Sequence, residues 1–221
     1  MELDGQFFSV GFLWVAGFIV AGLVALAVYL SPWYRLKDRE QLHVFLGSSV
    51  LMMIMWTMRT EVYIGVDFHL IFVTTLTLMF GWSLAILAGV LVVLGVSVAG
   101  IASWSGFPLN VLTTVIVPIS FTQLSLLLIR HWFPRHFFVF IYLNAFLTGG
   151  LSLMLSSFFA SFLLALATPV AFSVLWDTYL TYFPLMFFPE AVMNGWLVTL
   201  LVGYRPHWIS SFRDVDYLQG K

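Results

Sequence analysis

The chain has 221 residues, of which 62% are hydrophobic and only 9% are charged, and its mean hydropathy is +1.03. Soluble domains carry about 25% charged residues because their surfaces face water, so the composition excludes that class and predicts an all-α polytopic bundle in the lipid bilayer. A net charge of −1 without a basic cluster argues against a nucleic-acid partner, and zero cysteines exclude disulfides and thiolate metal sites.

Seven apolar runs stand between polar residues, and a membrane-spanning helix needs about 20 apolar residues. In chain order the runs cover residues 8–30, 43–58, 68–81, 83–104, 109–132, 137 to about 168, and 178–204. No Lys or Arg precedes the first run, which is longer than the apolar part of a signal peptide, so it is predicted to be a retained span.

The sixth run leaves two alternatives open. It contains Gly149-Gly150 and is followed by Thr168-Pro169, so residues 137–175 form either one long helix with an interfacial stretch or two helices in a tight hairpin. Lysine and arginine in short loops stay on the cytoplasmic side. Seven spans with the N-terminus outside leave only Arg59 outside and place eight basic residues inside: Arg35, Lys37, Arg39, Arg130, Arg135, Arg205, Arg213 and Lys221.

A hairpin in the sixth run would change this ratio of eight to one into five to four. We therefore predict about seven spans, with the N-terminus outside and the C-terminus cytoplasmic. Residues 1–204 would form a single transmembrane domain and residues 205–221 a short cytoplasmic interfacial tail. The expected location is the inner (plasma) membrane of the cell, as a multi-pass protein.

Two kinds of chemistry are excluded by the lysines. The chain has no GxxxxGK[ST] phosphate loop, so ATP-driven activity would come from a partner. Its two lysines, Lys37 and Lys221, lie outside the predicted spans, which excludes a retinal Schiff base. No cofactor is expected to be covalently bound, and no catalytic residues are predicted.

His131 and His136 flank Pro134 in a predicted loop and are interpreted as solvated interfacial residues.

Polar side chains inside apolar runs are the candidate functional residues, because such groups are costly in hydrocarbon and face the bundle interior or a substrate path. These residues are His69, Asn110, Gln123, Asn144, Glu190 and Asn194. Glu190 follows Pro189 and lies four residues before Asn194, on the same helix face. It is either a functional carboxylate or a buried packing residue hydrogen-bonded with Asn194.

His69 follows Asp67 near the outer start of the third run. A neutral imidazole there could bind a metal while the carboxylate orients its other nitrogen; the alternative is an ordinary interfacial histidine. Met52, Met55 and Met58 recur on the second run. They either suit a soft ion such as Cu(I) or simply pack.

Several segments, in this order, resemble the CbiM/NikM type, the substrate-specificity permease subunit of energy-coupling-factor (ECF) ABC transporters for cobalt and nickel. His69-Leu70, an apolar stretch and Gly81-Trp82 resemble one family helix, and Asn110 resembles the asparagine of the next helix pair. Phe188-Pro189-Glu190-Ala191, with Gly195 and Tyr204-Arg205-Pro206, resembles the last helix. The resemblance covers roughly residues 60–210 and implies a seven-helix bundle with the N-terminus outside.

The resemblance also implies a site. In this family the N-terminal amine, a histidine at the second position and a later histidine bind the metal. Here those positions correspond to Met1, Glu2 and His69; the sequence keeps Asp4-Gly5, is one position shorter, and has glutamate in place of the histidine. Replacing a nitrogen ligand by a hard oxygen suits a different ion or weaker nickel and cobalt binding.

The family implies an ECF transmembrane coupling subunit and ATP-binding subunits as partners, with Co²⁺ or Ni²⁺ as transported substrate and a possible link to cobalamin biosynthesis. The alternative is a membrane protein that kept the scaffold without metal transport and acts in assembly. An intramembrane enzyme using Glu190 and His69 is disfavoured, because neither has a recognisable nucleophile and base arrangement around it. The chain is therefore expected not to be an enzyme.

Overall fold

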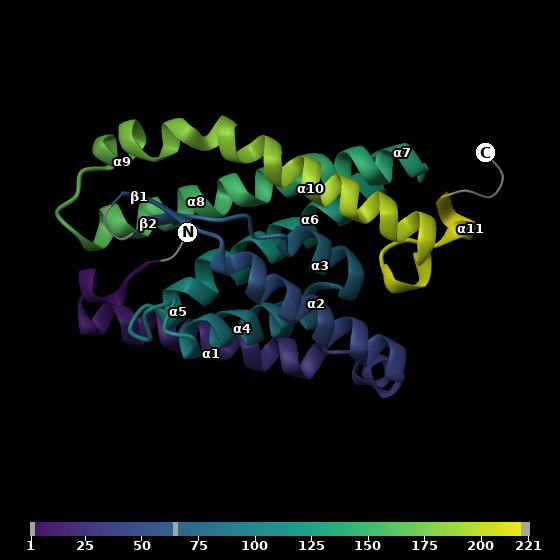
Figure 1. The fold of residues 1–221 in the computed structure, drawn as a ribbon, viewed down its shortest axis with the longest axis horizontal. Helices are drawn as coiled ribbons and strands as arrows, with labels where there is room; N and C mark the ends of the chain where they lie inside the picture. The colour runs from purple at the N-terminus through teal and green to yellow at the C-terminus, as the bar shows by residue number, and fades with distance from the viewer. Residues whose placement is uncertain (1–2, 64–65, 218–221) are drawn as a thin grey trace.

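The computed structural model of the chain describes residues 3–63 and 66–217, and within residues 60–68 it describes the backbone alone. The first half of the helical bundle (Figure 1) consists of α1 (Val10–Leu30), α2 (Arg39–Thr57), α3 (Val73–Phe80) and α4 (Trp82–Val98). Short 3-10 turns, η1 (Gly5–Phe7) and η2 (Trp33–Lys37), precede α1 and α2. An antiparallel hairpin of β1 (Thr60–Tyr63) and β2 (Val66–Phe68) precedes α3.

The second half begins with α5 (Phe107–Asn110), which continues through a π-helical turn, η3 (Val111–Ile116), into α6 (Val117–Trp132). Next come α7 (Phe137–Val139), the π-helical η4 (Phe140–Leu147) and α8 (Thr148–Ala167). The chain ends with α9 (Phe172–Thr178), η5 (Leu180–Tyr182), α10 (Phe183–Tyr204), η6 (Pro206–Trp208) and α11 (Asp214–Tyr217).

The predicted all-α membrane bundle is confirmed, with the β1–β2 hairpin as an addition. In the part of the chain that the structure describes, four helices are long and apolar enough to cross a membrane: Val10–Leu30, Phe107–Trp132, Phe137–Ala167 and Phe172–Tyr204. Each of the seven predicted runs contains a helix. The number of crossings and the side on which each terminus lies remain predictions.

The third predicted run is only partly helical, so the prediction of a helix that begins at residue 68 is wrong. Its helix, α3, begins at Val73 and has eight residues, all buried. Eight helical residues rise about 12 Å, too little to cross a hydrocarbon core of about 30 Å. The residues before α3 form the hairpin and an extended segment, residues 69–72, so polar backbone groups enter the protein interior there.

The sixth run contains one long helix and not a hairpin of two, because residues 137–167 form a single uninterrupted helix. A Cβ atom on Gly149 would lie 3.0 Å from the Cβ of Asn194, and one on Gly150 would lie 2.4 Å from the Phe187 ring. The two glycines therefore let α8 and α10 approach closely, as small residues do between membrane helices. They do not mark a turn; the helix ends before Thr168-Pro169.

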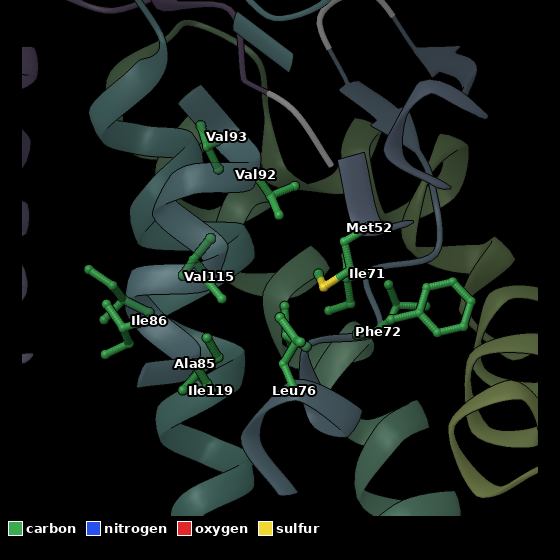
Figure 2. Packing of buried hydrophobic residues seen from close by; sticks show 14 of the residues in the cluster. Met52, Ile71, Phe72, Leu76, Ala85, Ile86, Val92, Val93, Val115 and Ile119 are labelled. Carbon is green, nitrogen blue, oxygen red and sulfur yellow. The ribbon is translucent and has the colours of Figure 1, made fainter. Parts of the chain in front are cut away.

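Aliphatic side chains fill the space around α3. Figure 2 shows Ile71 and Leu76 facing Val92 of α4 and Val115 of η3 across the centre of the bundle. All four side chains are no more than 2% exposed. α3 is thus enclosed by neighbouring helices, although it is short.

The C-terminal tail closes one end of the bundle, where η2, α7 and α11 gather (Figure 1). The backbone N–H groups of Ser210 and Ser211 donate to Met79 O and Leu78 O at 3.0 and 3.2 Å, and Arg35 donates to Phe80 O at 3.3 Å. These carbonyls belong to the last turn of α3, where helical partners are missing. The tail and Arg35 therefore cap the end of α3.

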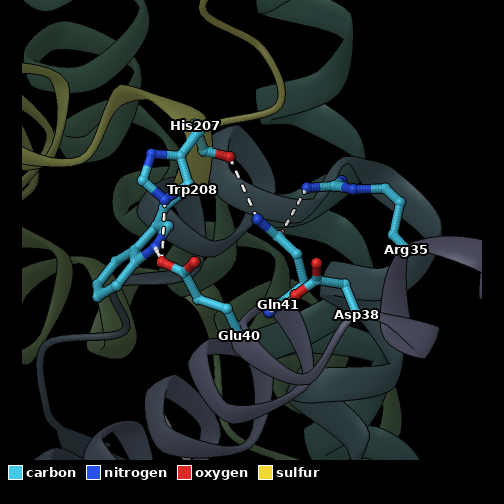
Figure 3. A network of polar contacts seen from close by, with 6 residues as sticks. All are labelled: Arg35, Asp38, Glu40, Gln41, His207 and Trp208. Carbon is cyan, nitrogen blue, oxygen red and sulfur yellow. Dashed lines mark hydrogen bonds and ion pairs between the residues drawn. The ribbon is translucent and has the colours of Figure 1, made fainter.

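A polar network attaches the start of the tail to α2 (Figure 3). Trp208 Nε1 donates to Glu40 Oε1 at 2.7 Å, and His207 Nε2 lies 2.9 Å from the same oxygen. Hydrogen bonds from His207 and Trp208 lower the pKa of the Glu40 carboxyl below its ordinary value. Gln41 also donates to His207 O at 3.3 Å. The network fixes the tail where α10 ends.

Candidate functional site

The segment that follows the N-terminus is held inside the protein by Asn110. Asn110 Oδ1 accepts from Leu3 N at 2.7 Å, and Asn110 Nδ2 donates to Leu3 O at 3.2 Å. One side-chain amide thus satisfies both backbone groups of Leu3, which is fully buried. Because buried backbone groups without partners are costly, this pair of bonds is what allows an extended chain to lie there.

Two glycines allow the same segment to pass close to the loop before α5. A Cβ on Gly106 would lie 2.0 Å from Leu3 O, and a Cβ on Gly5 would lie 2.3 Å from the Ser105 carbonyl carbon. Both distances are far below van der Waals contact, and the opposing atoms are backbone. The N-terminal segment and the loop before α5 are therefore in direct backbone contact, which only glycine permits.

His69 is buried beside this segment, in the loop between β2 and α3. Its ring lies 4.9 Å from the Trp56 ring, centroid to centroid, and Trp56 Nε1 donates to Ile71 O at 3.2 Å. His69 Nδ1 lies 3.3 Å from Leu70 O, so the tautomer that donates from Nδ1 leaves Nε2 as an acceptor. Nε2 is then the atom that could bind a cation.

His69 and Asn110 line one small cavity of about 10 Å³, together with Trp56, Arg59, Val93, Val96 and Thr114. A space of this size holds about one water-sized particle. The structure therefore joins residues from the second, third, fourth and fifth predicted runs around a space that fits one small ligand.

Glu190 supports the loop that carries His69. Its fully buried carboxylate accepts from Ile71 N at 2.9 Å through Oε2 and from Phe72 N at 2.8 Å through Oε1. Phe72 has a φ of +52°, a left-handed conformation that is unusual for a bulky residue. Non-helical backbone at membrane depth needs partners within the protein, and Glu190 provides two of them.

Asn194 extends this support by one turn. Its Oδ1 accepts from Thr75 N at 3.0 Å and from Thr75 Oγ1 at 2.7 Å, while its Nδ2 donates to Glu190 Oε1 at 2.8 Å. Thr75 N is one of the N–H groups at the start of α3 that lack a helical partner. Glu190 and Asn194 therefore act together as a clamp on the start of α3.

The predicted candidates thus fall into two groups. His69 and Asn110 share a cavity, whereas Glu190 and Asn194 lie behind the His69 loop with their polar atoms bonded to its backbone and to Thr75. Asp67 lies in β2 opposite Glu61, and its side chain is outside the described part of the structure. Met1 and Glu2 also lie outside the described residues.

Sequence reasoning missed Trp56 and Gly106, and it noted Gly5 only as part of the retained Asp4-Gly5 pair. Trp56 ends an apolar run, where tryptophan is common in membrane helices, and nothing in its position points to His69. The glycines could have been suspected only from the need for close backbone contact. Among the side chains that the structure describes, in residues 3–59 and 69–217, no group of three or more His, Cys, Asp or Glu could hold a metal ion.

A larger hollow of about 560 Å³ lies elsewhere, between α2, α3 and α10. Met52 and Met55 line it, with Met79 and Met193, but Met58 is 70% exposed and does not. The predicted row of three methionines therefore does not act as one ligand set. Most of the wall of this hollow is apolar, and its polar side chains, His43 among them, include no carboxylate.

A family model described as the cobalt uptake substrate-specific transmembrane region, CbiM, matches residues 3–208. The chain belongs to the CbiM family. The predicted resemblance to CbiM/NikM-like proteins is therefore confirmed, and the chain is a membrane component of cobalt or other metal uptake. The match begins at Leu3, the residue that Asn110 holds.

Two solved structures share this fold. One, described as a transition metal transporter, has a TM-score of 0.80 and 14% identity and covers 94% of this chain and 96% of its own. The other, a truncated transition metal transporter, has a TM-score of 0.76 and 13% identity and covers 92% of this chain and 99% of its own. No individually curated protein matches at a significant level. At these identities the structural likeness concerns the fold alone.

Proposed function

We propose that this CbiM-family protein is the substrate-binding permease subunit of an energy-coupling-factor ABC transporter, with Co²⁺ or Ni²⁺ as its substrate. The observation that carries the proposal is the cavity where buried His69 meets the anchored N-terminal segment. In this proposal Met1 and Glu2 complete the ligand set with His69. The subunit performs no catalysis itself; its partners are a transmembrane coupling subunit and ATP-binding subunits.

A carboxylate from Glu2 would place a hard oxygen beside the imidazole nitrogen of His69. Carboxylate oxygens suit Mn²⁺, whereas imidazole nitrogens suit Ni²⁺. Glutamate at this position would therefore shift the preference of the site toward the harder ion.

The proposed orientation places this site on the outer side of an inner (plasma) membrane, with seven spans. Support comes from the distribution of charge: η2, the start of α2 and the tail lie at the opposite end of the bundle from the β1–β2 hairpin (Figure 1). These elements contain Arg35, Lys37, Arg39 and Arg213. Basic residues gather on the cytoplasmic side of membrane proteins.

The test is calorimetric titration of the purified full chain with Co²⁺ and Ni²⁺. We expect binding, and His69→Ala should lower the affinity at least about 100-fold, because a ligand should matter more than the outer-shell partners that account for 10- to 100-fold. His43→Ala is the matched control, since His43 is an exposed histidine that does not line the cavity. If no divalent ion binds the wild type, the metal proposal fails.

Glu2→His tests the role of the second residue. It restores the nitrogen ligand of the resembled motif, so we expect the affinity for Ni²⁺ to rise about tenfold or more and the preference for Ni²⁺ over Mn²⁺ to increase. Titrations of wild type and variant with both ions measure this. Unchanged affinities for both ions would show that residue 2 is not a ligand.

A second candidate function follows from Glu2 itself. The resembled family has a histidine at that position, so a chain that lost metal transport could keep the scaffold and act in the assembly of other membrane proteins. Capture of the tagged full chain from its membrane distinguishes the two. Co-purified ATP-binding and coupling subunits support transport, and other membrane partners without them support assembly.

A further inference from the structure

A polar hollow of about 280 Å³ lies at the tail end of the bundle, far from His69 in the fold. It is lined by Arg130 at the end of α6, Arg135 in the following loop, and tail residues Ser210, Ser211, Arg213, Asp216 and Tyr217. We name it the arginine pocket. It shares no residue with the cavity beside His69.

The arginine pocket carries excess positive charge. Three arginines and one aspartate among its lining residues give a formal charge of +2. Asp216 is shared, because Arg135 Nη1 lies 3.6 Å and Arg213 Nη2 lies 2.8 Å from its oxygens. One carboxylate cannot neutralise three guanidinium groups, so the pocket favours a further anion.

Arg130 and Arg213 are held by hydrogen bonds, and all three guanidinium groups keep donors to spare. Arg130 uses Nε for Tyr217 Oη at 3.2 Å and Nη2 for Ser211 O. Arg213 uses Nε and Nη2 for Asp216. Each guanidinium has five N–H groups, so all three arginines retain donors beyond these contacts. Several guanidinium groups converging on a small space match the several oxygens of a phosphate.

The surroundings of the arginine pocket indicate where that phosphate comes from. Exposed aromatic residues lie within three positions of Arg130 or Arg135 in the chain: Trp132 is 75% exposed, Phe133 49% and Phe138 58%. Exposed aromatic residues at the end of a spanning helix typically lie at the level of lipid headgroups, and basic pockets there bind anionic headgroups. A free phosphate would not need this aromatic border.

We propose that the arginine pocket binds the phosphate of an anionic phospholipid through Arg130, Arg135 and Arg213. The lipid holds the tail against α6 and the loop that follows it. Because the tail also caps α3 through Ser210 and Ser211, the bound lipid stabilises the closed end of the bundle. The site is independent of metal binding at His69.

The test is native mass spectrometry of the delipidated full chain in detergent, titrated with phosphatidylglycerol or phosphatidylcholine. We expect tighter binding of phosphatidylglycerol, and the double variant Arg135→Gln/Arg213→Gln should weaken it about 25-fold, at about fivefold per arginine near the surface. Both side chains are largely exposed, at 53% and 74%, so the variant should fold. Arg39→Gln/Arg205→Gln is the matched control, with the same charge change outside the pocket.

The outcomes separate the sources of phosphate. Loss of binding in the pocket variant but not in the control supports the proposal. Equal loss in both, or none in either, overturns it, because the attraction would then be general or located elsewhere. Inorganic phosphate that displaces the lipid at equal concentration, through the same arginines, overturns the lipid assignment and assigns the arginine pocket to free phosphate.

Discussion

Replacing Glu190 with alanine is expected to unfold the His69 loop and to lower the stability of the whole bundle. The change leaves Ile71 N and Phe72 N buried without an acceptor. At about 1–3 kcal/mol for each unsatisfied group, the loss is about 2–6 kcal/mol. We expect the thermal unfolding midpoint in detergent to fall by about 5–20 °C, and metal affinity to fall at least about tenfold because His69 loses its position.

Glu190→Gln is expected to destabilise the bundle in the same way but by a smaller amount. The amide keeps one acceptor, but its NH₂ group would face Ile71 N or Phe72 N, placing a donor against a donor. The loss of stability should be about half that of Glu190→Ala. Thr199→Ala on the same helix is the control, since its hydroxyl bonds only to Gly195 O within α10, and it should leave the unfolding midpoint nearly unchanged.

These variants also separate support from direct metal binding. If Glu190 were a ligand, Glu190→Gln would weaken metal binding while leaving the unfolding midpoint of the metal-free protein unchanged. A supporting role predicts that both quantities change together. The hydrogen bonds of both carboxylate oxygens to backbone and Asn194 favour the second outcome.

The sequence predicts the pair of Glu190 and Asn194 but not what the pair holds. Their spacing of four residues places both on one helix face, and the cost of polar groups in lipid implies buried partners. Those partners are backbone N–H groups, which exist as free donors only because residues 69–72 are not helical. An apolar run such as 68–81 gives no sign of that break, since the left-handed Phe72 results from tertiary contacts.

The same limit explains Gly149-Gly150. Adjacent glycines fit a turn and also fit a close helix contact, and periodicity alone does not distinguish them. The structure shows the close helix contact, because Asn194 and Phe187 occupy the space that side chains at these positions would need.

The burial of the tail was also not predictable from the sequence. Its aromatic residues suited a membrane interface, yet Phe212 and Tyr217 are buried against Phe140.

Polar groups hold α3 at both of its ends. Glu190 and Asn194 hold its start, beside the His69 loop, while the tail and Arg35 hold its end. A helix of eight buried residues has few contacts of its own with lipid, so its position depends on these polar attachments. The position of the His69 loop, which precedes α3, therefore depends on both sets of attachments.

Gly106→Ala is expected to release the N-terminal segment and, with it, metal binding. The added methyl group would lie 2.0 Å from Leu3 O, so the segment must move and both Asn110 bonds to Leu3 must break. Two buried backbone groups lose their partners, which costs about 2–6 kcal/mol if they stay buried. If they move into solvent instead, the proposed ligands Met1 and Glu2 are carried away with them. Either way, calorimetry should detect an affinity at least about 100-fold lower.

Gly11→Ala provides the matched control for this substitution. No atom lies within 4 Å of a Cβ at Gly11, which lies in the first turn of α1. The same chemical change there should preserve metal affinity and raise helix stability slightly, because alanine is a better helix former than glycine. Asn110→Ala should cause the same loss of affinity as that expected for Gly106→Ala, without any steric clash. If Gly106→Ala and Asn110→Ala both bind the metal as the wild type does, the anchored N-terminal segment is not part of the site.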